Sequence, residues 1–206
     1  AKVSQRILHF ASRNGADIEG LGDKSVDLLT EHGLIRDIPS LYDLTQEKLE
    51  KLPRMGELSS SNLLAALEKS KHLPFNKFIF ALGLRHVGER TALILARFCR
   101  TIDKFLALDE EPLKRIQEIG EETARAIVSF LKSPEERAML SELLDKGFKL
   151  IPPPEEKVDG PLAGQSFVIT GTLASMSRPE AEARVVALSG KVGSSVSKKT
   201  SYVVAG

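Results

Sequence analysis

The residues best suited to chemistry in this sequence are glycines that end four short loops, each flanked by apolar side chains. A glycine adopts a positive φ without steric cost, and its missing side chain lets another molecule approach the backbone closely. Where such a loop opens a helix, unpaired backbone amides and the positive end of the helix dipole suit the binding of a phosphate oxygen. The four loops are Ile18–Gly22, Leu52–Gly56, Leu84–Gly88 and Ile116–Gly120.

These loops recur at a regular spacing, and each is followed by a helical pattern. Their final glycines lie 34, 32 and 32 residues apart, and an acidic residue follows each one. Behind the second and fourth loops, apolar residues recur at the i, i+1 and i+4 positions of a core-facing helix. They are Leu63, Leu64 and Leu67 and, 64 residues later, Ile127, Val128 and Leu131. We therefore expect residues 1–150 to be mainly α-helical, with four helix-loop-helix units in two pairs.

The loops resemble the helix-hairpin-helix motif, in which an apolar residue, a variable residue, Gly, an apolar residue and Gly join two helices. Only the first loop matches fully, because Arg54, His86 and Glu118 replace the first glycine in the others. The resemblance implies binding to DNA backbone phosphates, and we expect the fourth loop, with its acidic Glu118, to bind most weakly. The residues implied in DNA contact are Gly20, Gly22, Lys24, Arg54, Gly56, Arg85, His86, Gly88, Arg90 and Gly120.

A period of 32 to 34 residues also occurs in tetratricopeptide and ankyrin arrays, which bind peptides. The chain has no Trp and carries neither array's signature, which disfavours this alternative. The formal net charge is only +1, so any DNA binding must come from a local cluster of charges rather than from an overall basic balance.

Other chemistry-bearing residues carry weaker signals. The single cysteine, Cys99, lies in an apolar stretch and is expected to be a buried structural thiol. One cysteine and four scattered histidines do not form a metal-ligand pattern, so no metal site is predicted here.

Lys157, Asp159 and Gly160 match the Lys-x-Asp-Gly signature of nucleotidyltransferases. A nucleophilic lysine needs a depressed pKa, however, and the two glutamates before Lys157 favour the charged amine, so we predict no catalytic residue.

The C-terminal quarter has a different pattern. Residues 151–161 contain three consecutive prolines and are expected to form an extended linker. Residues 162–206 predict a β-α-β-β order with a parallel sheet, in which a helix begins at Ser177 with proline and glutamate in its first turn.

This region resembles the first part of an α/β BRCT domain. The resemblance rests on Gly164, residues 167–171, Ser177, Arg178, residues 190–192 and residues 195–206. The family continues with further helices and a strand, so we expect a truncated domain at residue 206. In phosphate-binding members a Ser or Thr ends the first strand, which makes Thr170 and Gly171 a candidate phosphate site; a purely structural role for Thr170 is the alternative.

Together, the loops, linker and BRCT pattern resemble the C-terminal region of bacterial NAD-dependent DNA ligases. Residues 17–22 and 81–89 are particularly similar. The resemblance implies that NAD, magnesium and zinc bind to domains upstream of residue 1, and that this region itself is inactive and holds no cofactor. It implies nicked double-stranded DNA and the upstream domains as partners of a monomer that acts in replication and repair.

Without an apolar run long enough to span a membrane or act as a signal peptide, the expected location is the cytoplasm, with the nucleoid. Two alternatives stay open. One is a non-enzymatic repair or replication scaffold built from the same modules. The other is a region devoted to protein interaction.

Overall fold

The computed structural model describes residues 2–154, 160–171, 173, 175–197 and 200–206. It divides the chain into two compact units, Ala1–Pro153 and Pro154–Gly206, called unit 1 and unit 2 below. Within the described ranges, no helix is long and apolar enough to cross a bilayer.

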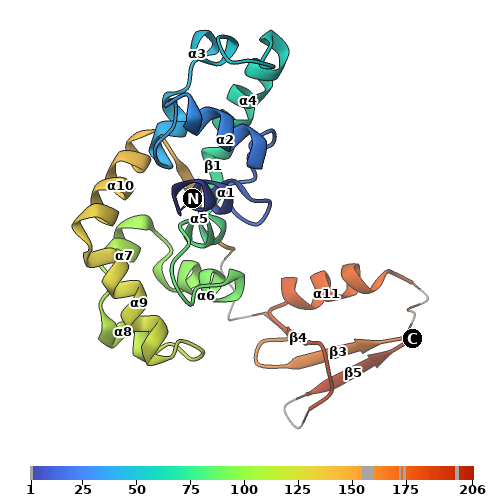
Figure 1. The fold of residues 1–206 in the computed structure, drawn as a ribbon. Helices are drawn as coiled ribbons and strands as arrows, with labels where there is room; N and C mark the ends of the chain where they lie inside the picture. The colour runs from blue at the N-terminus through green and yellow to red at the C-terminus, as the bar shows by residue number, and fades with distance from the viewer. Residues whose placement is uncertain (1, 155–159, 172, 174, 198–199) are drawn as a thin grey trace. The chain divides into compact units, whose positions relative to one another are not determined.

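Unit 1 is built almost entirely of helices, as the sequence predicted (Figure 1). Its first half contains α1 (Lys2–Ala11), α2 (Asp23–Glu31), the 3-10 helix η1 (Pro39–Asp43), α3 (Gln46–Glu50) and α4 (Glu57–Ser70). Its second half contains α5 (Phe75–Ala81), α6 (Glu89–Cys99), α7 (Ile102–Leu106), α8 (Glu110–Lys114), α9 (Glu121–Lys132) and α10 (Pro134–Asp145).

The two halves repeat the same local plan. Helices α3 and α8 begin 64 residues apart, and so do α4 and α9. Each short approach helix buries one leucine completely, Leu49 in α3 and Leu113 in α8. The predicted core-facing residues of the longer helices are buried or packed against the core, which explains why these segments form amphipathic helices.

A cluster of aromatic rings joins the two halves. Phe148 lies 6.4 Å from Phe10, 5.1 Å from Tyr42 and 5.7 Å from Phe78, measured between ring centroids. These partners come from α1, η1 and α5, so one side chain near the end of unit 1 contacts both halves.

A parallel pair of short strands closes unit 1, and the sequence analysis did not predict it. Strand β1 (His72–Pro74) links α4 to α5, and β2 (Lys149–Ile151) follows α10. Leu73 pairs with Leu150 in this ladder. The expected linker 151–161 therefore starts at the last residue of β2. Residues 155–159, including Lys157 and Asp159 of the nucleotidyltransferase-like signature, lie outside the described residues.

Unit 2 has the predicted β-α-β-β order and a parallel sheet. It contains β3 (Ser166–Thr170), α11 (Arg178–Ala187), β4 (Lys191–Gly193) and β5 (Tyr202–Ala205). The strand order is β4-β3-β5, with both neighbours parallel to β3. The central strand buries Phe167, Val168 and Ile169.

The helix of unit 2 begins at the predicted capping residues. The carboxylate of Glu180 accepts hydrogen bonds from the backbone amide and the hydroxyl of Ser177, both at 2.8 Å. These bonds, the backbone one first, hold the pKa of Glu180 below its usual value. The bonds satisfy groups that would otherwise be unpaired at the start of α11.

Candidate nucleic-acid interface

The four loops share one backbone conformation although only the first has glycine at its third position. That position has a left-handed φ in every loop, at Gly20 (86°), Arg54 (65°), His86 (63°) and Glu118 (81°). In each, the amide of the fourth residue donates to the carbonyl of the first, over 3.1 to 3.3 Å. The flanking apolar residues are buried or packed against the core, so packing maintains a conformation that side chains normally avoid.

Each loop opens a helix whose N-cap is glycine. Gly22, Gly56, Gly88 and Gly120 precede α2, α4, α6 and α9. None provides a side-chain cap, so the first amides of these four helices have no capping oxygen from the N-cap residue. The predicted acidic residue lies in the first turn each time, where it complements the helix dipole.

Other helices in unit 1 begin differently. Thr45, Thr101 and Ser133 cap α3, α7 and α10, and each side chain accepts a hydrogen bond from a backbone amide in the first turn. The chain therefore uses capping side chains at these three helices and has none at the four helices that follow the loops.

Neither backbone strain nor crowding requires glycine at the four N-caps. Their φ angles lie between −77° and −99°, which any residue adopts. A Cβ added at Gly22, Gly56, Gly88 or Gly120 would meet nothing within 4 Å. Intramolecular packing thus leaves these glycines unexplained, whereas close approach by another molecule explains them.

The loops follow one another across unit 1 in the order second, first, third, fourth. A cleft of about 790 Å³ is lined by Gly20 and Ser25 next to Met55 and Ser59, which brings the first and second loops together. Contacts between side chains join the first loop to the third and the third to the fourth. Figure 1 shows α3 and α4 at one end of unit 1 and α8 and α9 at the other.

One polar contact connects the first loop to the third, and another connects the third loop to the fourth. Asn14, just before the first loop, donates to Glu89 at the start of α6 over 2.8 Å. Arg90, the next residue of α6, makes a two-pronged ion pair with Glu118 of the fourth loop, at 2.7 and 2.8 Å. Arg90 was predicted to contact DNA, and its pairing with Glu118 was not predicted.

The predicted DNA-contact residues are all exposed, as a contact surface requires. They are Gly20, Gly22, Lys24, Arg54, Gly56, Arg85, His86, Gly88, Arg90 and Gly120. Cations accompany the first three loops, whereas the fourth loop carries Glu118 and is followed by Glu121 and Glu122. Because carboxylates repel anions, weak binding by the fourth loop stays a prediction.

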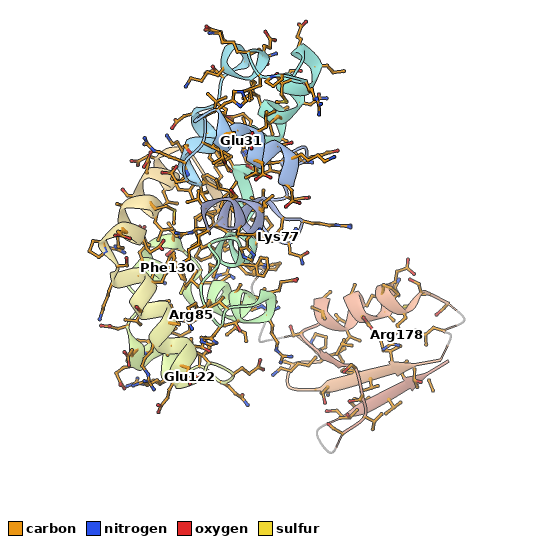
Figure 2. All side chains as sticks on the ribbon, viewed as in Figure 1. Glu31, Lys77, Arg85, Glu122, Phe130 and Arg178 are labelled. Atoms are coloured by element: carbon orange, nitrogen blue, oxygen red, sulfur yellow. The ribbon has the colours of Figure 1, made fainter. Side chains whose placement is uncertain are left out.

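A groove of about 1060 Å³ adjoins the third loop. Its lining includes Arg85 and His86 of that loop, Gln5 of α1, and Glu122 and Phe130 of α9. Figure 2 labels Arg85 in the third loop, and Glu122 and Phe130 on α9. Residues on α1 and α9 thus extend the surface beside the third loop, a proximity that loop spacing alone does not encode.

The candidate phosphate residues of unit 2 lie at the end of β3. Thr170 is exposed, and its carbonyl accepts a hydrogen bond from the amide of Gly206 at 3.1 Å. Gly171 has a φ of 76°, and a Cβ there would come within 2.6 Å of the Gly206 carbonyl oxygen. Gly171 therefore has a structural reason to be glycine.

Cys99 lies at the end of α6 and is 1% exposed, in agreement with the prediction of a buried thiol. Burial raises its pKa to about 12. At pH 8 the folded chain should hold on the order of a thousandfold less thiolate than an ordinary cysteine. We expect negligible iodoacetamide labelling of the native chain and rapid labelling in denaturant, measured by intact mass. Fast native labelling would mean that α6 opens readily.

Comparison with known protein families agrees with this description. Residues 77–140, which include the third and fourth loops, match the helix-hairpin-helix motif family. Residues 157–206 match the BRCA1 C Terminus (BRCT) domain family. The chain therefore combines a helix-hairpin-helix region with a BRCT region.

Whole-chain relatives are DNA ligases. The chain is 45% identical to a DNA ligase of Desulfosudis oleivorans, 43% to one of Nitrosococcus oceani and 46% to one of Trichlorobacter lovleyi. Each match covers 100% of this chain but only 30 to 31% of the relative. The chain is thus homologous, over its full length, to a segment of these DNA ligases.

Proposed function

We propose that this chain is the DNA-backbone-binding region of an NAD-dependent DNA ligase that seals nicks in duplex DNA during replication and repair. Unit 1 binds the DNA backbone in this proposal, and it does so without recognising the base sequence. Contacts to phosphates position a protein on a duplex without selecting bases, which suits an enzyme that must act at any nick.

The observation that carries this proposal is the set of glycine N-caps in open space. Gly22, Gly56 and Gly88 leave helix amides accessible, although φ and packing would allow a capping side chain at each position. Helix N-termini of this kind hold phosphate oxygens through backbone amides and the helix dipole. Lys24, Arg54 and Arg85 add exposed positive charge beside them.

The arrangement of the loops supports contact with an extended backbone rather than with one isolated phosphate. The second, first and third loops follow one another through the cleft between Gly20 and Ser59 and through the bond from Asn14 to Glu89. A duplex laid across them would meet several helix N-termini in succession. The fourth loop, with its carboxylates, contributes least to this grip.

Ligation chemistry belongs, in this proposal, to other parts of the ligase. NAD, magnesium and zinc would bind there. Among the described residues, no three His, Cys, Asp or Glu side chains come together. This chain would act as a monomer in the cytoplasm, with nicked DNA and the remaining ligase domains as its partners.

A salt series with variants that each lack one positive charge tests whether the loops bind DNA phosphates. Binding of the chain to a labelled nicked duplex should weaken steeply with salt, because each phosphate contact releases a counterion. Lys24→Ala, Arg54→Ala and Arg85→Ala should each lower the slope of log K against log salt by roughly 0.9.

Arg36→Ala is the matched control, because Arg36 is an exposed cation that belongs to none of the loops. Its slope should equal that of the unaltered chain. Binding that does not depend on salt, or equal slopes for all four variants, would count against a phosphate grip by the loops.

A further inference from the structure

The ion pair between Arg90 and Glu118 joins residues of two different loop-helix units. Arg90 is the second residue of α6, close to Gly88, which ends the third loop and is the N-cap of this helix. Glu118 is the left-handed residue of the fourth loop, at the position held by Gly20 in the first. A carboxylate of one predicted DNA-contact loop thus binds a cation of another.

The geometry of the pair matches that of an arginine bound to phosphate. The Nε and one terminal nitrogen of Arg90 each donate to a different oxygen of Glu118, at 2.7 and 2.8 Å. A guanidinium offers the same planar fork to carboxylates and phosphates. Glu118 therefore occupies the donors that Arg90 would offer to a DNA backbone.

Both members of the pair remain accessible to an incoming ligand. The side chain of Arg90 is 81% exposed and that of Glu118 is 44% exposed. The hydrogen bond to Glu118 raises the pKa of Arg90, and the bond to Arg90 lowers the pKa of Glu118, so both are charged at neutral pH. Exposed pairs contribute little to stability, so this one can exchange its partner at small cost.

We propose that Glu118 is an internal competitor for DNA phosphate at Arg90, which releases the arginine when a backbone phosphate replaces the carboxylate. The inference rests on the proposed DNA binding and adds a role for the fourth loop. That loop limits the affinity of its neighbour instead of gripping DNA itself.

Comparison with the other loop cations sharpens this interpretation. Among the described residues, Lys24 and Arg54 make no ion pair with a carboxylate, so their charge is available to a ligand from the start. Arg90, in contrast, must exchange partners. The pairing also ties the third loop to the fourth only while DNA is absent.

Charge-neutralising variants with a double-mutant cycle test the exchange. Glu118→Gln should tighten binding to a nicked duplex about three- to fivefold at low salt, because an exposed pair of this kind is weak. Glu122→Gln removes the same charge from a residue of α9 that forms no ion pair within the described residues, and should tighten binding less. In an Arg90→Ala background, the two glutamine variants should become equal.

The outcomes separate this inference from the proposed function. Equal effects of Glu118→Gln and Glu122→Gln, or an extra effect of Glu118→Gln that persists without Arg90, would overturn the competition while leaving DNA binding intact. An unaltered chain that fails to bind nicked duplex at low salt would overturn both proposals. Thermal melting of each variant verifies that the fold is unchanged.

Discussion

Aspartate in place of Gly22, Gly56 and Gly88 is expected to stabilise the fold and to abolish most of the DNA binding. The triple variant should melt slightly higher than the unaltered chain, while its affinity for nicked duplex should fall by about tenfold or more for each loop that contacts a phosphate. Effects of opposite sign on stability and on binding would identify these positions as functional.

The opposite signs follow from the geometry of the N-caps. Each glycine has an extended φ and open space for a side chain, so aspartate fits without strain. An aspartate N-cap accepts a hydrogen bond from a first-turn amide and stabilises a helix over glycine by roughly a few tenths of a kcal/mol. The same carboxylate would occupy the amides that a phosphate needs and would repel the phosphate as well.

Thr101→Asp controls for the added charge. Thr101 caps α7, which follows no glycine loop, and its side chain already accepts a hydrogen bond from Lys104. A single added carboxylate there should weaken DNA binding only slightly at moderate salt. Fluorescence anisotropy with nicked duplex and thermal melting supply the two measurements. If the three loop substitutions, made singly, bind like Thr101→Asp, the helix N-termini do not hold the backbone.

Local patterns predicted much of the fold because local physics determines it. Helices α2, α4, α6 and α9 each begin with an acidic residue directly after a glycine, and their buried faces follow a helical period, as Ile127 and Leu131 illustrate. The strand that buries Phe167 and the capping box at Ser177 are equally short-range signals. Each depends on a few consecutive residues, so a single sequence displays it.

The features that were missed depend on long-range proximity. Leu73 pairs with Leu150, which lies about half the length of unit 1 further along the chain, and neither three-residue strand is long enough to show a period. Asn14 meets Glu89 only because α1 packs beside α5. Likewise, Arg90 was assigned to DNA from its loop alone, because nothing in its neighbourhood along the chain reveals a carboxylate 28 residues away.

Truncation of Phe78 to alanine should have the largest effect on the stability of unit 1. Phe78 is fully buried in α5, and its ring contacts Phe148, which also touches Phe10 and Tyr42. Phenylalanine-to-alanine changes in such cores cost about 3–5 kcal/mol in free energy of unfolding. That is a large share of the roughly 5–15 kcal/mol that holds a typical domain together.

The position of Phe78 also determines how its loss should affect function. Phe78 belongs to α5, which packs against α1 of the first half, so its removal loosens the packing that orders the loops without touching any of them. Denaturant-dependent hydrogen exchange should show weaker protection throughout residues 2–153, and unchanged protection in β3, which has its own core.

Phe98→Ala, on the half-exposed face of α6, is the control, and it should change the free energy of unfolding by no more than about 0.5 kcal/mol. Equal losses at Phe78 and Phe98 would show that the aromatic cluster does not hold the two halves together, whereas a loss confined to Phe78 would make the loop order a consequence of this core.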